Sequence, residues 1–512
     1  MASSHDPAAT SQASALAFLG SPDAFGGLAV RRIDTHASSV FLAGDRALKV
    51  KRAVRLPFLD YSTLQKRKAA CEEELRINQP SAPQIYRAVV PIVRGSDGRL
   101  AIGGDGAVVE WALDMVRFDE DQTLDRLAAT DGVDDAMALE IADAIARAHR
   151  QANRIAGSTS WPGSIPTLVA RNTTRFRSSI FPPTEIHALD SAGLSAFARV
   201  QSVLQRRAEE GFVRRCHGDL HLANIARLDG HPVLFDAIEF DPAIATTDVL
   251  YDLAFTIMDL LRFKQARAAG IVFNRYLAVF GQDQIDGLAA LPLFMSLRAA
   301  IRAHVLLTRH ERERDRESVD SARAYFALAN DLIHPKKPEL VAVGGLSGTG
   351  KSVLARALAG EISPPPGAVI VRSDIIRKQM FNVEETARLP AAAYDLSVTQ
   401  AVYGRLVQTA ARVLEQGLSV IADAAWLQEA ERTAIREMAD ARGVAFGGLF
   451  LNADLATRLT RIGSRKNDAS DATVEIATLQ EDYKLGYMDW AVVDASGSER
   501  ETLARSLAQL GR

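Results

Sequence analysis

Cysteine is almost absent from this sequence, and that scarcity limits what the chain can be. Only Cys71 and Cys216 occur in 512 residues, far apart and without metal-ligand spacing. So few thiols exclude a disulfide-stapled scaffold and fit a reducing compartment. We expect both cysteines to be buried as small apolar side chains. Because Cys216 lies beside a polar motif, its oxidation is expected to disturb that motif.

A strong charge of one sign and a long apolar run are also lacking. The formal net charge is −3, so no global basic field points to nucleic acid or an anionic membrane. No run of about 18 apolar residues occurs, and the best candidate, 250–261, is interrupted by Asp252 and Asp259. Residues 1–28 predict a disordered or weakly helical leader without a secretory signal, because they are rich in Ala and Ser and have no basic region. We expect a cytoplasmic protein that binds neither nucleic acid nor membrane.

The pattern of apolar residues predicts two domains. The first, 29–333, begins with short strands, among them a hairpin around Gly44 and Asp45, and continues mostly as helices. Two prolines break the last helix in 334–339, which makes this segment the linker. In 340–512, strands and helices alternate. This alternation predicts a three-layer α/β/α domain with a parallel sheet.

The second domain begins with a sequence motif that is typical of phosphate-binding loops. The run Gly-Leu-Ser-Gly-Thr-Gly-Lys-Ser at 345–352 matches GxxxxGK[ST] between a predicted strand and a predicted helix. Backbone N–H groups and the helix N-terminus hold phosphate oxygens in such a loop. Lys351 would reach the β and γ phosphates of ATP, and Ser352 would bind Mg²⁺. The alternative is a Gly-rich turn before a helix. The expected ATP-binding residues are Gly345, Gly348, Thr349, Gly350, Lys351 and Ser352.

Two aspartates and a row of arginines extend this site. Asp374 follows a predicted strand, where it could accept a proton from an acceptor hydroxyl or cap the next helix. Asp423 ends another apolar strand, a position that suits a carboxylate near Mg²⁺. Arg458, Arg461 and Arg465 recur at helical spacing. They could close over phosphates, or they could form a solvated basic helix face.

Together these residues resemble the P-loop small-molecule kinases of the gluconate kinase, chloramphenicol phosphotransferase and zeta-toxin type, which carry an AAA-type ATP-binding domain. The resemblance spans about 340–497. It implies ATP-dependent phosphoryl transfer. It also implies that Asp374 is the catalytic base and that Arg461 and Arg465 bind phosphate.

A second polar motif lies in the first domain, where 217–224 reads His-Gly-Asp-Leu-His-Leu-Ala-Asn. Asp219 and Asn224 have the spacing of the kinase catalytic loop HRDxxxxN, and Asp236 ends a strand farther on. Phosphoryl transfer needs a carboxylate that orients or deprotonates the attacking hydroxyl, and oxygen ligands for Mg²⁺. We assign Asp219 to the first role and Asn224 and Asp236 to the second. A plain polar turn is the alternative.

This region, about 32–330, resembles the aminoglycoside phosphotransferase and choline kinase group of the protein-kinase-like bilobal fold. The resemblance implies a strand lysine that binds ATP and pairs with a helix glutamate. Lys49 and Glu74 are our choice, and Lys51 on the same strand face stays an alternative. The sequence departs from the group because no clear Gly-rich phosphate loop precedes Lys49, and Ser38–Ser39 are expected in that turn.

Two further pairs of residues belong to this resemblance. Asp248 and Asp252 match a DxxxDLA helix start of the group, and we expect them to be structural. Arg298 and Arg302 lie on a predicted helix near the acceptor side. If they point inward they favour an anionic acceptor, and otherwise they are ordinary surface ion-pair residues.

The sequence as a whole predicts a Mg²⁺-dependent, bifunctional ATP phosphotransferase that acts on hydroxyls of small molecules. Two alternatives remain. The kinase-like half could be a nucleotide-binding regulator of a catalytic P-loop half, or the P-loop half could be a toxin-like sugar-nucleotide kinase. The sequence names neither acceptor, and it decides neither the oligomeric state nor a role in antibiotic resistance.

Overall fold

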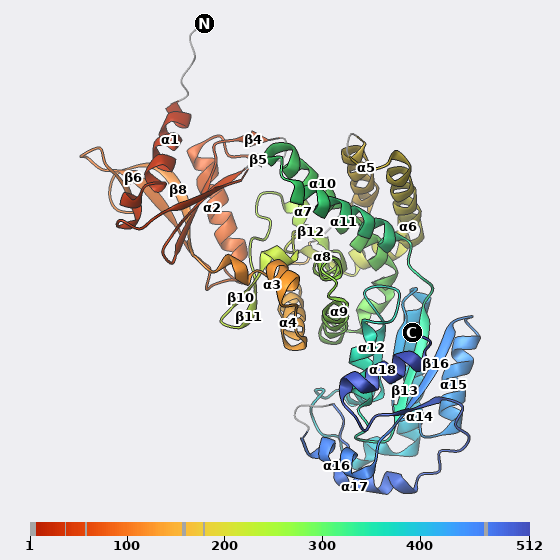
Figure 1. Cartoon of the computed structure of the whole chain (residues 1–512). Helices are drawn as coiled ribbons and strands as arrows, with labels where there is room; N and C mark the ends of the chain where they lie inside the picture. The colour runs from red at the N-terminus through yellow and green to blue at the C-terminus, as the bar shows by residue number, and fades with distance from the viewer. Residues whose placement is uncertain (1–6, 36, 57–58, 156–159, 178–179, 465–468) are drawn as a thin grey trace. The chain divides into compact units, whose positions relative to one another are not determined.

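The computed structural model describes most of the chain (Figure 1), namely residues 7–35, 37–56, 59–155, 160–177, 180–464 and 469–512. The chain divides into two compact units. Unit 1 comprises Met1–Val133, Ala144–Trp161 and Arg207–Asp259, and unit 2 comprises Asp134–Asp143, Pro162–Arg206 and Leu260–Arg512. Because these units do not follow the linker at 334–339, the predicted boundaries 29–333 and 340–512 stay predictions.

A six-stranded antiparallel sheet forms the N-terminal part of unit 1, in the order β1-β2-β3-β8-β6-β7. The predicted hairpin is confirmed, because β2 and β3 pair on either side of Gly44, whose φ of +56° suits a residue without a side chain. Helix α2 (Leu64–Asn78) lies against this sheet (Figure 1) and is capped by the Thr63 side chain. The strands are Arg31–Asp34 (β1), Ser38–Ala43 (β2), Arg46–Lys51 (β3), Tyr86–Arg94 (β6), Leu100–Ile102 (β7) and Ala107–Val116 (β8).

The leader 1–28 was expected to be disordered or weakly helical; where the structure describes it, a helix is present and the disordered alternative is wrong. Helix α1 (Pro7–Leu19) packs on the sheet, and its Ala15 and Leu19 side chains are buried in the sheet's apolar core. The Gln12 side chain donates a hydrogen bond to the carbonyl oxygen of Lys51 at 3.0 Å. Small side chains such as alanine give a weak amphipathic signal, so only the packing reveals that this segment is structured.

The rest of unit 1 is built from short strands and one long apolar helix. Strand β9 pairs antiparallel with β12, and β10 pairs antiparallel with β11. Helix α8 follows β12 directly and has most of its side chains buried. The bounds are Val213–Arg215 (β9), Ile225–Leu228 (β10), His231–Leu234 (β11), Thr246–Asp248 (β12), Val249–Arg262 (α8) and Leu124–Thr130 (α3). Helix α4 (Asp135–Gln151) belongs to unit 1 only from Ala144 onward.

Unit 2 begins with a group of helices. Arg302 on α10 places its guanidinium 5.8 Å from the centre of the Tyr325 ring on α11, so it packs between helices. The stretch Asp283–Glu311 is long and apolar enough to cross a membrane, but 67% of its most apolar window is buried, as in a core helix of a soluble protein. The helices are Ile165–Phe176 (α5), Pro183–Glu209 (α6), Ala266–Phe280 (α9), Leu291–Glu313 (α10) and Arg316–Ile333 (α11).

A five-stranded parallel sheet, in the order β14-β15-β13-β16-β17, forms the C-terminal part of unit 2. Helices α12 and α18 pack into one apolar core with it, and α14 and α15 contact each other and the strands (Figure 1). The predicted α/β/α domain is therefore confirmed. The elements are Glu339–Gly345 (β13), Lys351–Ala359 (α12), Val369–Arg372 (β14), Leu396–Glu415 (α14), Val420–Asp423 (β15), Glu429–Asp440 (α15), Ala445–Asn452 (β16), Ala491–Asp494 (β17) and Glu499–Gln509 (α18).

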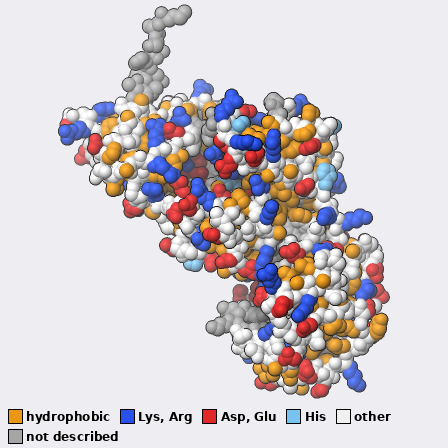
Figure 2. Space-filling model, in the orientation of Figure 1, with side chains coloured by type: hydrophobic (Ala, Val, Ile, Leu, Met, Phe, Trp, Pro, Cys, Tyr) orange, Lys and Arg blue, Asp and Glu red, His pale blue; other side chains and the backbone are white. Residues whose placement is uncertain are grey.

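Charged side chains of both signs are interspersed over the face of the molecule that Figure 2 shows. This mixture agrees with the small formal net charge of −3.

Candidate active sites

Side chains of helix α8 hold the loop that carries Asp219 through hydrogen bonds. Asp252 accepts hydrogen bonds from the backbone N–H groups of His217 at 3.1 Å and of Gly218 at 2.9 Å. The ring of His217 donates through Nε2 to the carbonyl oxygen of Phe235 at 2.9 Å. Burial lowers the pKa of His217, which keeps this ring neutral. The structural role expected for Asp252 is thus confirmed, and its effect is to position the loop.

Two further side chains of α8 hold the same loop. Thr256 donates to the carbonyl oxygen of Leu220 at 2.7 Å, and Asp259 accepts from the N–H of Leu222 at 2.9 Å. In the sequence, Asp259 stood out only as an interruption of an apolar run. The usable signal was the spacing of Asp252, Thr256 and Asp259, because polar residues at i, i+4 and i+7 share one helix face.

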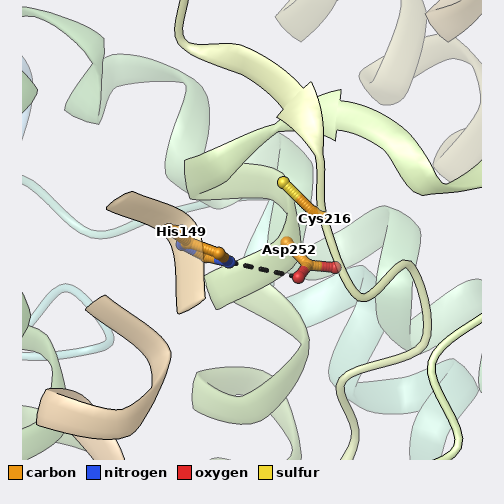
Figure 3. A group of neighbouring side chains, drawn as sticks. All are labelled: His149, Cys216 and Asp252. Carbon is orange, nitrogen blue, oxygen red and sulfur yellow. Dashed lines mark hydrogen bonds and ion pairs between the residues drawn. The ribbon is translucent and has the colours of Figure 1, made fainter. Parts of the chain in front are cut away.

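His149, Cys216 and Asp252 form a buried group beside this loop (Figure 3), with their possible ligand atoms within 4.8 Å of one another. His149 Nε2 donates to Asp252 Oδ2 at 3.2 Å, and the Cys216 thiol donates to the Thr247 carbonyl at 3.5 Å. Because Asp252 also accepts two backbone N–H groups, we interpret the group as a support for the loop. The expectation that both cysteines are buried is confirmed.

Lys49 on β3 lies between two carboxylates. Its Nζ is 2.7 Å from Glu74 Oε1 and 2.8 Å from Asp236 Oδ1. Burial opposes a charged lysine, but Asp236 and Glu74 outweigh burial and raise the pKa of Lys49 well above its usual range. Burial likewise opposes ionisation of both carboxylates, yet Lys49 keeps the pKa of Glu74 and of Asp236 below the usual range. All three groups are therefore charged at neutral pH.

Lys51, the alternative lysine, shares Glu74 with Lys49. Its Nζ is 2.5 Å from Glu74 Oε2, and its side chain is 2% exposed against 16% for Lys49. Lys51 also pairs with Glu239, which accepts the Tyr61 hydroxyl at 3.1 Å. Because Lys49 contacts Asp236 while Lys51 turns to Glu239, the geometry favours Lys49 as the lysine that faces a nucleotide.

Asn224 and Asp236 lie with Asp219 at one site. The Asn224 side chain donates to the Asp219 carbonyl oxygen at 2.8 Å and to Asp219 Oδ2 at 3.3 Å. The Asp219 charge is near enough to act on the pKa of Asp236. Asp236 has a left-handed φ of +59°, a conformation that costs about 1–3 kcal/mol and recurs at active sites. These oxygen-bearing side chains suit Mg²⁺, and the Lys49 ammonium on Asp236 shows that positive charge is favoured there.

The expected position of Ser38 and Ser39 in the turn before Lys49 is wrong. Ser38 and Ser39 do not occupy the turn before Lys49, because both lie in β2 and are buried. The Ser39 hydroxyl donates to Asp34 at 2.6 Å, and the intervening turn begins at Thr35, whose hydroxyl accepts from the N–H of Ser38 at 2.9 Å. Residue 36 of that turn lies outside the described residues.

The phosphate-binding loop predicted at 345–352 lies between β13 and α12. Gly345 and Gly348 have φ values of +139° and +88°, and a Cβ at Gly348 would meet the Arg458 carbonyl oxygen at 2.6 Å. Glycine is needed there for both conformation and space. Thr349 is 1% exposed, and Lys351 Nζ donates to the Leu346 carbonyl at 3.0 Å, so the lysine lies along the loop.

Ser352 and Asp423 come together at the end of the sheet. The Ser352 hydroxyl donates to Asp423 Oδ2 at 2.7 Å. Arg372 donates through Nε to the same carboxylate oxygen at 3.1 Å and through Nη2 to Ser352 Oγ at 2.8 Å. A hydroxyl and a carboxylate are oxygen ligands of the kind Mg²⁺ prefers, and the bound guanidinium shows that a cation is stabilised between them. No role for Arg372 was expected from the sequence.

The remaining predicted residues are placed as follows. Asp374 lies in the first turn of α13 (Ser373–Met380), whose N-cap is Arg372, so the helix-capping alternative for Asp374 is not what the structure shows. Arg461, on α16 (Leu455–Ser464), donates to the Thr349 carbonyl at 3.4 Å and to the Gly497 carbonyl at 2.9 Å, beside the phosphate-binding loop. Arg465 lies outside the described residues.

Arg458, by contrast, turns away from the loop. Its side chain is fully buried, and its Nη2 donates to the Ala477 carbonyl at 3.2 Å and also pairs with Glu481. Arg458 therefore connects α16 to α17 (Val474–Leu479). For this residue, both predictions, phosphate binding and a solvated basic helix face, are wrong.

Fold and sites together define a two-domain enzyme of the kinase type. A family model described as a phosphotransferase enzyme family matches residues 30–288, about half of the chain, and an AAA domain model matches residues 340–483. The chain therefore belongs to the phosphotransferase enzyme family. The family resemblances drawn from the two motifs are confirmed.

The chain is also similar to two mycobacterial proteins and, more distantly, to solved structures. Proteins of Mycobacterium tuberculosis and Mycobacterium bovis, each named an uncharacterized protein, are 28% identical over 488 residues, covering 92% of this chain and 94% of each relative. A gluconokinase of Sinorhizobium meliloti is similar at 20% identity, covering 35% of this chain and 94% of its own, with a TM-score of 0.25. A Plasmodium vivax ethanolamine kinase is similar at 10% identity, covering 64% and 95%, with a TM-score of 0.40. At these values the likeness says nothing about substrate.

Proposed function

We propose that the protein is a bifunctional, Mg²⁺-dependent phosphotransferase in which each site transfers the γ-phosphoryl group of ATP to a hydroxyl of a small molecule. The observation that supports the proposal is that each unit brings its predicted site residues together. Lys49, Glu74 and Asp236 form one charged network beside Asp219 in unit 1. In unit 2 a phosphate-binding loop ends at Ser352, against Asp423.

In the first site, Asp219 is the group that orients the acceptor hydroxyl and takes its proton as the new O–P bond forms. The bond that breaks joins the γ-phosphorus to the oxygen that leaves with ADP. Lys49 supplies positive charge where negative charge accumulates, and Glu74 positions Lys49. Asp236 and Asn224 supply the oxygen ligands for Mg²⁺, which neutralises phosphate charge when bound.

In the second site the backbone does more of the binding. The N–H groups of the glycine loop and the N-terminus of α12 face the phosphates, and Lys351 adds a charge. Asp374 takes the acceptor proton, and Arg461 lies beside the loop, where it stabilises charge on the transferred group. Ser352 and Asp423 are the candidate ligands for Mg²⁺.

The deciding experiment compares products of the wild-type protein with those of Asp219→Ala and Lys351→Ala. Purified full-length protein is supplied with ATP, Mg²⁺ and a cell metabolite extract, and phosphorylated products are identified by mass spectrometry. We expect each variant to lose a different product. Asp229→Asn and Lys336→Ala, at exposed positions, are the matched controls and should keep both products.

Other outcomes of this experiment would favour one of the two alternatives to a bifunctional enzyme. If Asp219→Ala keeps every product while Lys351→Ala loses all of them, unit 1 does not catalyse transfer, and the regulatory alternative replaces the bifunctional one. Growth arrest on expression, abolished by Lys351→Ala, would instead favour the toxin-like alternative.

A further inference from the structure

Arg372 occupies an unusual place at the phosphate-binding loop. It ends β14 directly beside Asp423 of β15, since the two residues are partners in the parallel register. Its guanidinium bonds both Asp423 and Ser352, at 3.1 and 2.8 Å. These are the two side chains whose oxygens are the candidate ligands for Mg²⁺.

The electrostatics of this arrangement favour a tight contact. The Asp423 side chain is 4% exposed and that of Arg372 is 19% exposed, so water screens the pair only weakly. A buried carboxylate without a counter-charge is costly, and the guanidinium supplies that charge. A divalent cation that binds Asp423 would make the same compensation, so the two cations compete for one position.

The β14 backbone is fixed, so a release of Arg372 involves its side chain. On one side β14 pairs with β15. On its other edge, Asn274 of α9 takes the place of a strand, because its side-chain amide donates to the Ala368 carbonyl at 3.0 Å and accepts from the Ile370 N–H at 2.8 Å. Both edges of the strand are thereby held.

The side chain also has space to move. Arg372 and Ser352 line a cavity of about 230 Å³ whose other walls include Ile271, Ile370 and Ile375. A guanidinium that leaves Asp423 can therefore turn into this cavity.

We propose that Arg372 is the resident cation of the phosphate-binding loop, and that Mg²⁺ has to displace it from Ser352 and Asp423 in order to bind with ATP. The inference rests on the proposed function, because it takes this loop to be an ATP site. Its consequence is a reduced apparent affinity for the metal, since only the fraction of molecules with Arg372 released is competent to bind.

The test measures metal binding and does not require turnover. Mn²⁺, used in place of Mg²⁺, is titrated into full-length Asp219→Ala protein holding a non-hydrolysable ATP analogue, and bound Mn²⁺ is followed by electron paramagnetic resonance. Lys351→Ala in the same background identifies the signal from the phosphate-binding loop. Arg372→Met is expected to bind this Mn²⁺ roughly tenfold more tightly, because the competing charge is gone.

Three variants complete the design. Arg372→Gln keeps a hydrogen-bond donor without the charge, should tighten binding in the same direction, and replaces Arg372→Met if that protein does not fold. Arg372→Lys keeps the charge and should bind Mn²⁺ nearly as the parent does. Arg356→Met removes a charge from an exposed position on α12 that lines the same cavity, and it should leave the affinity unchanged.

An unchanged or weakened Mn²⁺ affinity in both neutral variants, with the ATP analogue still bound, overturns the role of Arg372. Equal tightening in Arg356→Met overturns it as well, because the effect would then be general charge removal. A failure of the parent protein to bind the analogue at this loop would overturn the proposed function itself.

Discussion

In unit 1 the site residues come from distant parts of the chain, whereas in unit 2 most of them lie in one short run. Lys49 and Asp236, which touch at 2.8 Å, are 187 positions apart. The phosphate-binding loop, by contrast, occupies the continuous stretch 345–352. A site made of adjacent backbone groups needs a local conformation, while a site made of charged side chains needs the whole fold to bring them together.

The two sites also differ in the side chain that neutralises the carboxylate proposed to bind Mg²⁺. In unit 1, Lys49 forms an ion pair with Asp236, and Lys49 is itself expected to contact ATP. In unit 2, Arg372, which lies outside the phosphate-binding loop, forms an ion pair with Asp423. A cationic side chain therefore pairs with the proposed metal-binding carboxylate at both sites, but only in unit 1 is that side chain itself a proposed ATP-binding residue.

The largest expected effect distinguishes the two lysines of β3 from each other. Lys49→Met should reduce formation of the unit 1 product about 10³-fold, because it removes charge stabilisation at the transferred phosphate. Lys51→Met should chiefly lower the free energy of unfolding, by about 3–5 kcal/mol, because the buried carboxylates of Glu239 and Glu74 lose the positive charge that they share.

Steady-state kinetics and urea unfolding followed by circular dichroism check these two outcomes. If Lys51→Met loses turnover while its stability is unchanged, and Lys49→Met keeps turnover, the roles of the lysines are exchanged.

The second prediction concerns the backbone of the phosphate-binding loop. Gly348→Ala should reduce the unit 2 product about 100-fold, because the added Cβ meets the Arg458 carbonyl and displaces the loop from its phosphate geometry. Gly404→Ala is the matched control, since nothing lies within 4 Å of a Cβ there. Product formation at both sites is the measurement, and equal losses at both sites would contradict a local effect.

The third prediction tests the support beneath the unit 1 loop. Asp252→Asn should reduce the unit 1 product about 50-fold, because the amide cannot accept all the hydrogen bonds from His217, Gly218 and His149. The unit 2 product should be unchanged. Asp229→Asn, at an exposed turn with φ of +51° that asparagine tolerates, serves as the control. Normal unit 1 turnover in Asp252→Asn would show that the loop holds without this support.

The smallest expected effect is a pH dependence of stability in unit 2. Burial, with Arg171 and Arg175, lowers the pKa of His304 to about 4 from an ordinary 6.5. The unfolded chain therefore takes up a proton that the folded chain does not, and stability falls as the pH drops from 7 towards 4. At pH 5 the loss is about 2 kcal/mol.

Urea unfolding of unit 2, followed at pH 7 and pH 5, measures this loss. His304→Gln should remove that part of the pH dependence, while His231→Gln, at an exposed position, should keep it. Identical pH profiles for the wild-type protein and His304→Gln would exclude His304 as the source.

Features that depend on neighbouring residues could be predicted from the amino-acid sequence. The loop at 345–352, the hairpin around Gly44, and the alternation that gives a parallel sheet all follow from local patterns, and the structure agrees. The spacing of Asp219 and Asn224 likewise places both in one loop, because five positions cannot separate them far.

Which charged side chains pair with one another became known only from the folded arrangement of the chain. It paired Glu74 with both Lys49 and Lys51, placed Arg372 on Asp423, and turned Arg458 away from the phosphate-binding loop. It also showed that the leader packs on the sheet, through Ala15 and Leu19. These outcomes depend on contacts between segments that are distant in the chain. The burial and electrostatic energies of such contacts are set by the surrounding fold, so the local order of residues does not indicate them.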